Sequence, residues 1–492
     1  MNEQTPNILV ICSDQHHPLM TGYREHAFVQ TPNLDRLAQN GTHFTRAYCN
    51  SPICVPSRMS FITGKYPHQV DSWCIGIPMD REEMTWARRL DRAGIPSTML
   101  GKMDFCGEYQ DGGFSEHKIM HRRKAWEKIP PETPWAARLK GYTRTDKRAH
   151  VLRAGPESGV LRNRKEEPRG VVSHFEHDRQ VTDWALDYLK EKGRDSQDKP
   201  WALYMGYLFP HWPFCVPDEY YEMYYPDRLE LPENARFPNP ELHPALYHFQ
   251  QALDLGTVTE DMLQRTVAAY YGMITCMDAM IGEIFAELEN QGLAQNTYVI
   301  YTSDHGESLG EHGLFYKQCS YEGSAGVPLI VSGPGLPQGK QVDLPVSLVD
   351  LYPTVMEMAG LETEADRPGR SWLPLVRGED QDRPDYAFSE FHANFLRHDW
   401  YMLVRGDFKY TYYANERPSL FHVKEDPKED RDLAEDLAYG DVLKDFEALL
   451  RSIVDPDETT LRAKHDLGLM GTDGTDYTET LSVEDLADDI RH

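Results

Sequence analysis

The chain has 492 residues, and its 51 lysines and arginines against 79 aspartates and glutamates give a formal net charge of −28. Such a charge argues against nucleic acid and against anionic membrane surfaces as partners, and no apolar run approaches the roughly 20 residues of a membrane span. The polar start shows no secretory signal, and eight scattered cysteines indicate reduced thiols, so we expect a cytoplasmic protein.

The first predicted element is a buried strand, because residues 7–12 form a nearly continuous apolar run. Asp14 and Gln15 follow directly after it. In open α/β sheets ligands bind at the carboxyl ends of the strands, so both side chains are candidates for a binding site. An aspartate in this place could equally cap a turn.

A cysteine at a predicted helix start is the most distinctive feature of the chain. Pro56 fits the beginning of a helix, because its missing N–H is not needed there. Cys54 is therefore predicted to lie just ahead of a helix N-terminus, where backbone N–H groups and the helix dipole favour an anion. Arg58 lies one turn further on. Taken alone, such a cysteine is better explained as a buried structural thiol, because free cysteine usually behaves as a small hydrophobic residue.

Two more buried strands are predicted at 93–100 and 200–208. The first leads to Lys102 and Asp104, and the second leads to His211. Residues 105–175, which lie between the two strands, show little periodicity and are locally basic. A segment of this kind favours a lid that selects the substrate, or else a solvated loop.

A long amphipathic helix is predicted over 263–288, because apolar residues recur every three or four positions. The strand at 297–302 follows, and it stops at Asp304 and His305. Lys317 lies a short way beyond. An aspartate thus follows each of two predicted strands that are far apart in the sequence.

The last part of the chain predicts a small second domain. A stretch rich in proline, glycine, arginine and aspartate at 365–385 indicates a boundary, so we divide the chain into domains at 1–380 and 381–492. In the second domain we expect two antiparallel strands at 400–413 and 419–423 and a covering helix at about 436–454. An acidic tail at 472–492 could contact a second subunit.

The pattern Cys54-x-Pro56-Ser57-Arg58, with Thr63-Gly64 after it, resembles the signature of the type I sulfatases in the alkaline phosphatase superfamily. The resemblance covers most of residues 6–430. It implies an α/β fold, an alkaline-phosphatase-like mixed sheet sandwiched by helices, with a smaller C-terminal α+β domain. The domain at 1–380 would then be catalytic and would hydrolyse a sulfate monoester.

The resemblance implies two cofactors. The cysteine of the signature is oxidised in this family to formylglycine, so Cys54 requires a formylglycine-generating maturation enzyme as a partner. One divalent metal ion would be held by residue 54 together with Asp14, Gln15, Asp304 and His305, although the family carries an acid where this chain has Gln15. Oxygen ligands suit calcium or magnesium and the imidazole suits manganese or zinc, so we name Ca²⁺ or Mn²⁺ without choosing between them.

The remaining candidates would act on the substrate. By resemblance, Lys102, His211 and Lys317 bind the sulfate group, and Arg58 orients residue 54. Asp104 is also placed at the substrate, but it stands where the family carries a histidine that touches the formylglycine hydroxyl, so its role is open.

By resemblance the reaction is a double displacement on the hydrated aldehyde. One hydroxyl attacks sulfur, and the alcohol leaves with a proton from His211 or Lys317. The second hydroxyl then loses a proton and expels sulfate, which regenerates the aldehyde.

Two other functions are open. The first is hydrolysis of phosphonate monoesters or phosphodiesters, which some relatives with formylglycine carry out with the same machinery. Gln15 and His305 are compatible with that function. A non-catalytic binder of sulfated ligands is the second. The substrate is a small-molecule or saccharide sulfate ester whose alcohol is aryl, choline-like or a sugar. A choline-like cation would need acids and aromatic rings, for which Asp104, Trp73 and Trp212 are candidates.

Overall fold

A computed structural model describes residues 5–107, 109–118, 154–156, 173–194, 199–379, 383–392 and 398–470. Its centre is an eight-stranded mixed sheet in the order β11-β2-β10-β9-β1-β7-β4-β5. Of these strands β10 alone runs against its neighbours. The bounds are β1 (Asn7–Ser13), β2 (Thr42–Phe44), β4 (Ser97–Gly101), β5 (Glu116–Lys118), β7 (Ala202–Gly206), β9 (Thr297–Ser303), β10 (Leu329–Ser332) and β11 (Lys340–Val342).

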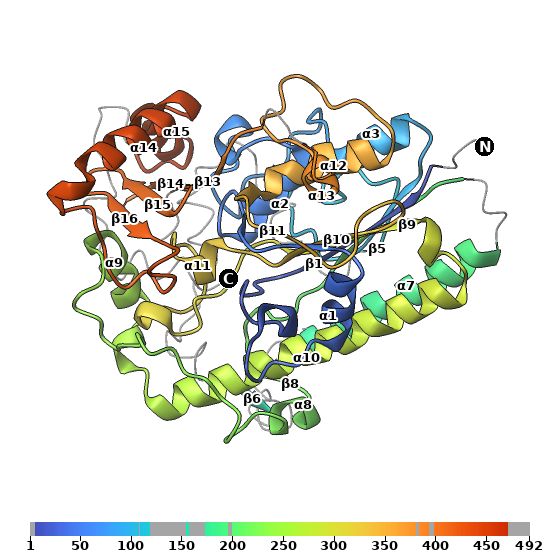
Figure 1. The fold of residues 1–492 in the computed structure, drawn as a ribbon, viewed down its shortest axis with the longest axis horizontal. Coiled ribbons are helices and arrows are strands. Elements are labelled where there is room, and N and C mark those ends of the chain that lie inside the picture. Colours follow the sequence, from blue (N-terminus) through green and yellow to red (C-terminus); the bar gives the residue numbers. More distant parts are fainter. Residues whose placement is uncertain are drawn as a thin grey trace.

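Helices cover both faces of this sheet (Figure 1). Along β1, Ile8 and Val10 pack into one buried cluster, whereas Leu9 and Ile11 pack into the other. Both faces of the strand are buried, which is why its sequence is a continuous apolar run. The first face carries α2 (Cys54–Thr63), α3 (Trp86–Arg92) and α12 (Leu351–Met358), and the second carries α1 (Pro32–Gln39), α7 (His174–Arg194) and α10 (Glu260–Asn290).

The long helix predicted over 263–288 is confirmed as α10, which spans 31 residues and buries its apolar side against the sheet. Within the described ranges, no helix combines the length and the apolar character that crossing a membrane requires. Shorter elements complete the large domain: β3 (Ala47–Tyr48), β6 (Gly155–Pro156), β8 (Cys215–Val216), α8 (Asp218–Glu222), α9 (Pro244–Ala252), α11 (Glu322–Ala325), β12 (Val346–Ser347) and α13 (Leu373–Arg377).

The predicted helix start near Pro56 is two residues too late. Ile53 has an extended backbone with φ −157° and ends the preceding segment, so Cys54 is itself the first residue of α2. Pro56 then occupies the third helical position, where an N–H would still have no partner within the helix. Cys54 is thus part of the helix end and not a residue ahead of it.

The small C-terminal sheet has four antiparallel strands, not the two that were predicted. The segment 400–413 is a hairpin that turns at Gly406, whose φ is +56°. The domain boundary at 380 and 381 stays a prediction, and both the tail from 472 and most of the segment 105–175 lie outside the described residues. The elements are β13 (Tyr386–Phe391), β14 (Trp400–Arg405), β15 (Phe408–Tyr413), β16 (Ser419–His422), α14 (Gly440–Ile453) and α15 (Pro456–Asp466).

A chain of alternating histidines and carboxylates ties the C-terminal sheet to the large domain. Glu390 of β13 accepts from the backbone N–H of His68 and lies 2.9 Å from its Nδ1. His392 lies between Glu390 and Asp399, at 3.1 and 3.0 Å. Burial alone would lower the pKa of His392, but hydrogen bonds to Asp399 and Glu390 raise it to about 9.

We predict that this cluster stabilises the fold less as the pH rises into the alkaline range. The pKa of His392 is higher in the folded state, so its contribution is complete below about pH 6.5 and is lost as the pH rises through about 9. One pKa unit corresponds to about 1.4 kcal/mol, so we expect a loss of about 3 kcal/mol in the free energy of unfolding. Denaturant unfolding at pH 7 and pH 10 measures it.

The control is the double variant His392→Gln with Asp399→Asn, which removes the titrating histidine together with the carboxylate that it neutralises. Its free energy of unfolding should change less between pH 7 and pH 10 than that of the parent protein. An equal change in both proteins would show that the cluster does not carry the pH dependence.

Candidate active site

Most of the predicted site residues follow the carboxyl ends of four adjacent strands. Ser13 of β1 pairs with Ser303 of β9, so the residues that follow them, Asp14 and Asp304, are brought side by side. On the other side of β1, the strands β7 and β4 run in the same direction. They lead to His211 and Lys102, respectively. The topology therefore gathers at one sheet edge residues that are far apart in the sequence.

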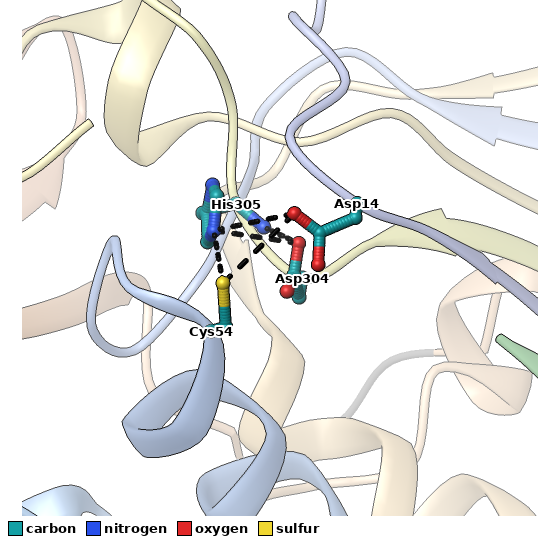
Figure 2. Close-up of side chains that lie close together, drawn as sticks. All are labelled: Asp14, Cys54, Asp304 and His305. Carbon is teal, nitrogen blue, oxygen red and sulfur yellow. Dashed lines mark hydrogen bonds and ion pairs between the residues drawn. The ribbon is translucent and has the colours of Figure 1, made fainter. Parts of the chain in front are cut away.

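Cys54 points from the start of α2 toward these strand ends (Figure 2). Its Sγ lies 3.4 Å from His305 Nε2 and 3.9 Å from Asp14 Oδ1. The Nζ atoms of Lys102 and Lys317 are 3.7 and 3.8 Å away. Burial and the charge of Asp14 raise the pKa of the Cys54 thiol to about 12, so this thiol is neutral at physiological pH.

Arg58 was expected to orient residue 54, but its side chain bonds elsewhere. Its Nη2 lies 2.9 Å from Asp14 Oδ2 and its Nε lies 2.9 Å from Asp304 Oδ2, and all three side chains are fully buried. Nη1 donates to the carbonyl of Lys102 and to the Tyr204 hydroxyl. Arg58 therefore holds the two carboxylates in place, and it acts on residue 54 only through these carboxylates.

The two aspartates titrate in opposite directions. Burial works to raise the pKa of Asp14, but the charges of Lys102 and Arg58 outweigh it and hold the pKa well below its usual value. At Asp304 burial prevails over the charge of Arg58, and the charge of Asp14 adds to it, so the pKa is raised. One proton is thus favoured on Asp304 unless another cation is present.

The donor set fits a divalent metal ion. Asp14, Cys54, Asp304 and His305 each offer one ligand atom, these atoms all lie within 4.8 Å of one another, and all four residues are buried. Two carboxylates buried so close together need positive charge to stay ionised. Burial, with the charge of Lys317, holds the pKa of His305 well below its usual value, which leaves a neutral imidazole able to act as a ligand.

Lys102 lies between two acids. Its Nζ is 2.6 Å from Asp14 Oδ2 and 3.6 Å from Asp104 Oδ2. Burial opposes its charge, but Asp104 and Asp14 raise the pKa of Lys102, so the ammonium form is kept. Asp104 has a left-handed backbone with φ +70°, which is uncommon for a residue other than glycine and marks a conformation held by its surroundings.

Gln15 lies between a lysine and an acid that the sequence analysis did not single out. Its Oε1 accepts from Lys317 Nζ, and its Nε2 donates to Glu307. Glu307 is fully buried, and burial raises its pKa to about 7. Its position three residues after Asp304, in a loop at a strand end, was the one sequence signal that could have identified it.

His211 lies at the edge of the cluster. Its Nε2 is 3.8 Å from Asp14 Oδ1, and its Nδ1 is 2.5 Å from the carbonyl of Trp212. A carbonyl only accepts, so Nδ1 carries a proton. Burial and the charge of Lys317 hold the pKa of His211 well below its usual value, which leaves Nε2 without a proton. The ring of His174, which the sequence analysis did not predict, packs edge-on against it.

Of the two tryptophans that were predicted as candidates for contact with a cationic substrate, Trp73 serves another contact. Trp73 is buried, donates from Nε1 to Asp466 of α15, and packs against His392 and Arg462. It is thus part of the contact with the C-terminal domain. Trp212 stacks on His211 and stays a candidate for substrate contact.

Comparison with known proteins identifies the relatives of the chain. The family model described as Sulfatase matches residues 6–361, and the one described as N-sulphoglucosamine sulphohydrolase, C-terminal, matches 310–455. Arylsulfatase K of Danio rerio is 31% identical over 471 residues, which cover 92% of this chain and 84% of the relative. Arylsulfatase K of Homo sapiens is 31% identical over 476 residues, which cover 92% and 82%.

Solved structures share the fold of this chain. A phosphonate monoester hydrolase of Agrobacterium radiobacter has a TM-score of 0.74 at 26% identity, covering 95% of this chain and 99% of that chain. The protein BT4656, solved with its substrate D-glucosamine-2-N,6-O-disulfate, has a TM-score of 0.74 at 21% identity, covering 92% and 100%, and shows a shared fold. The predicted architecture of a sandwiched mixed sheet with a small C-terminal domain is confirmed, and the chain belongs to the sulfatase family.

Proposed function

We propose that the protein hydrolyses a sulfate monoester to an alcohol and inorganic sulfate, with residue 54 as the nucleophile. The observation that carries this proposal is the position of Cys54 Sγ, 3.7 Å from Lys102 Nζ and 3.8 Å from Lys317 Nζ at the start of α2. A sulfate group attacked from this point would have its oxygens against two ammonium groups and a helix N-terminus. The relatives named Arylsulfatase K support the same activity.

We propose further that residue 54 acts as formylglycine. A thiol whose pKa is raised to about 12 is a poor nucleophile at neutral pH, because the thiolate is the reactive form. Once formed by a maturation enzyme, the hydrated aldehyde would supply a hydroxyl as the nucleophile. The raised pKa of the unmodified thiol is therefore compatible with a site built for another side chain.

A divalent metal ion would be held by Asp14, Asp304, His305 and residue 54. Gln15 lies beside this set, since its backbone N–H donates to Asp304 Oδ1, but its side-chain oxygen accepts from Lys317. When bound, it would supply positive charge that polarises a sulfate oxygen and the attacking hydroxyl. Carboxylate oxygens combined with one imidazole are compatible with Ca²⁺ or Mn²⁺.

The side chains divide the remaining work. Lys102 and Lys317 neutralise the sulfate, and Asp104 helps to keep Lys102 charged. The sequence left open whether His211 or Lys317 protonates the departing alcohol. His211 holds its proton on Nδ1 against the Trp212 carbonyl, so we assign the proton transfer to Lys317. His211 would then lie at the edge of the sulfate site, where its unprotonated Nε2 can accept only from a hydroxyl or an ammonium group, because sulfate oxygens do not donate.

The substrate we propose is a small-molecule or saccharide sulfate ester. An aryl or sugar alcohol fits better than a choline-like one, because the buried Trp73 is taken up by contacts with the C-terminal domain. Cytoplasmic localisation stays our proposal, supported by eight cysteines that are scattered through the sequence. Assembly into a homo-oligomer is a further proposal, which rests on the acidic segment 472–492.

Hydrolysis of phosphonate monoesters is the second candidate. The phosphonate monoester hydrolase of Agrobacterium radiobacter is 26% identical and covers almost the whole chain. The site described here would hold a phosphonate anion with the same lysines. The greater identity to the relatives named Arylsulfatase K favours sulfate.

We expect purified enzyme with modified residue 54 to hydrolyse 4-nitrophenyl sulfate with a kcat/KM at least about tenfold above that for 4-nitrophenyl phenylphosphonate. That ratio corresponds to about 1.4 kcal/mol of preferential transition-state stabilisation. Steady-state kinetics on both esters at one pH decide between the two candidates. A ratio reversed in favour of the phosphonate would establish the second function, and turnover of neither ester would count against both.

Mass spectrometry of the peptide that contains residue 54 should show an aldehyde or its hydrate in place of the thiol. Replacement Cys54→Ala should lower kcat for the sulfate ester by at least about 1,000-fold, because the nucleophile is lost. The matched control is Cys276→Ala in α10, a buried cysteine remote from the site, which should keep the parental kcat. A protein that turns over sulfate while residue 54 is entirely unmodified cysteine would contradict the proposal.

Removal of metal by a chelator should abolish turnover, and Ca²⁺ or Mn²⁺ should restore it and raise the unfolding temperature, since the ion binds the folded state only. In Asp304→Asn the metal affinity should fall by more than roughly 10- to 100-fold, which is the loss typical of replacing a residue that only hydrogen-bonds to a metal ligand. Calorimetric titration of the metal into metal-free protein measures this affinity. Asp183→Asn, at an exposed position of α7, is the control. Equal affinities in the two variants would refute the assigned ligand.

A further inference from the structure

Glu307 is a buried carboxylate beside the site to which the reaction described above gives no part. Its Oε1 accepts from the backbone N–H groups of Leu309 and Tyr316, at 2.8 and 2.5 Å. Its Oε2 accepts from Gln15 Nε2. The side chain has no exposed surface, so each of these donors replaces a water that burial removed.

The partners of Gln15 permit only one orientation of its amide. Lys317 has only donors, so the amide oxygen must face it. With its oxygen turned to Lys317, the amide presents its nitrogen to Glu307 Oε2, which accepts from it while Oε1 accepts from the two backbone N–H groups. The backbone of Gln15 is held as well, because its N–H donates to Asp304 Oδ1 and its carbonyl accepts from the Tyr270 hydroxyl.

Lys317 is thereby connected to Glu307 by two routes. Through Gln15, Glu307 fixes the oxygen that holds the Lys317 ammonium group. Through the N–H of Tyr316, it fixes the backbone directly before Lys317. Leu309 and Tyr316 have left-handed φ values of +45° and +72°, conformations that persist only where the surroundings over-determine them.

We propose that Glu307 is a positioning residue, which sets the amide of Gln15 and thereby holds the Lys317 ammonium group beside residue 54. This role rests on the proposed function in one respect, namely that Lys317 contacts the sulfate group of the substrate. The hydrogen-bond pattern itself requires one acceptor-only group at 307 and one amide at 15, or the reverse.

Exchanging the two groups gives a sharp test. In Glu307→Gln, two NH₂ groups would face each other, so Gln15 must turn and present its own NH₂ to Lys317. In Gln15→Glu, two carboxylates would face each other. In the double variant, the amide oxygen at position 307 again accepts from Leu309 and Tyr316. The NH₂ of that amide donates to the carboxylate at position 15, which in turn accepts from Lys317. The complete pattern is restored with the groups exchanged.

The experiment is a double-mutant cycle on full-length protein, read by the thermal unfolding midpoint without metal and by kcat and KM for 4-nitrophenyl sulfate. We expect Glu307→Gln to lower kcat/KM at least about tenfold and the midpoint by at least about 2 °C. Gln15→Glu should also lower the midpoint, and the double variant should recover most of both losses, since coupled neighbours are not additive. Glu283→Gln, which alters an exposed ion pair with Arg179, is the matched control.

The midpoint cycle needs no substrate, so it decides on Glu307 even if the protein hydrolyses no sulfate. Recovery in the exchanged variant, including recovery of folded protein where Glu307→Gln does not fold, supports the role. An exchanged variant that is no better than Glu307→Gln in either the midpoint or the yield of folded protein overturns it. Parental kcat/KM and midpoint in Glu307→Gln would overturn it too.

Discussion

The site depends on the buried contacts of Arg58 with Asp14 and Asp304, both at 2.9 Å. Removing three charged groups from water is costly, and that cost is offset only where geometry and hydrogen bonding are good. A guanidinium suits this place because its planar fork can donate to two carboxylates at once, and it has further N–H groups for Tyr204 and the Lys102 carbonyl. A lysine would offer one point of charge.

The sheet explains why these groups meet. β9, β1, β7 and β4 are adjacent and parallel, so their carboxyl ends form one edge. The helix α2 brings Cys54 to the same edge from a loop, with its N-terminus toward the strand ends (Figure 2). The side chains are thus fixed by rigid elements, which is what a preorganised electrostatic site requires.

The sequence predicted the parts of the fold and site that local pattern encodes. Apolar runs ended by acids located β1, β9, Asp14 and Asp304, because both faces of those strands are buried. The contact of Arg58 with Asp14 and that of Glu307 with Gln15 could not be predicted, since these partners lie on other elements brought close only by the tertiary fold. β13 was missed because it lies next to the assumed linker, and Trp73 was misjudged because aromatic residues serve contacts between domains as readily as ligands.

The charges of the site give an independent reason to expect a metal ion. Within the described residues, three cationic side chains face four carboxylates, namely Arg58, Lys102 and Lys317 against Asp14, Asp104, Asp304 and Glu307. The whole chain is also strongly acidic, at −28. A sulfate ester approaching such a site would meet no excess of positive charge while all four acids are ionised. A divalent cation between Asp14 and Asp304 would reverse that sign and would remove the reason for a proton on Asp304. The same ion would therefore keep the acids ionised and allow an acidic protein to bind an anion.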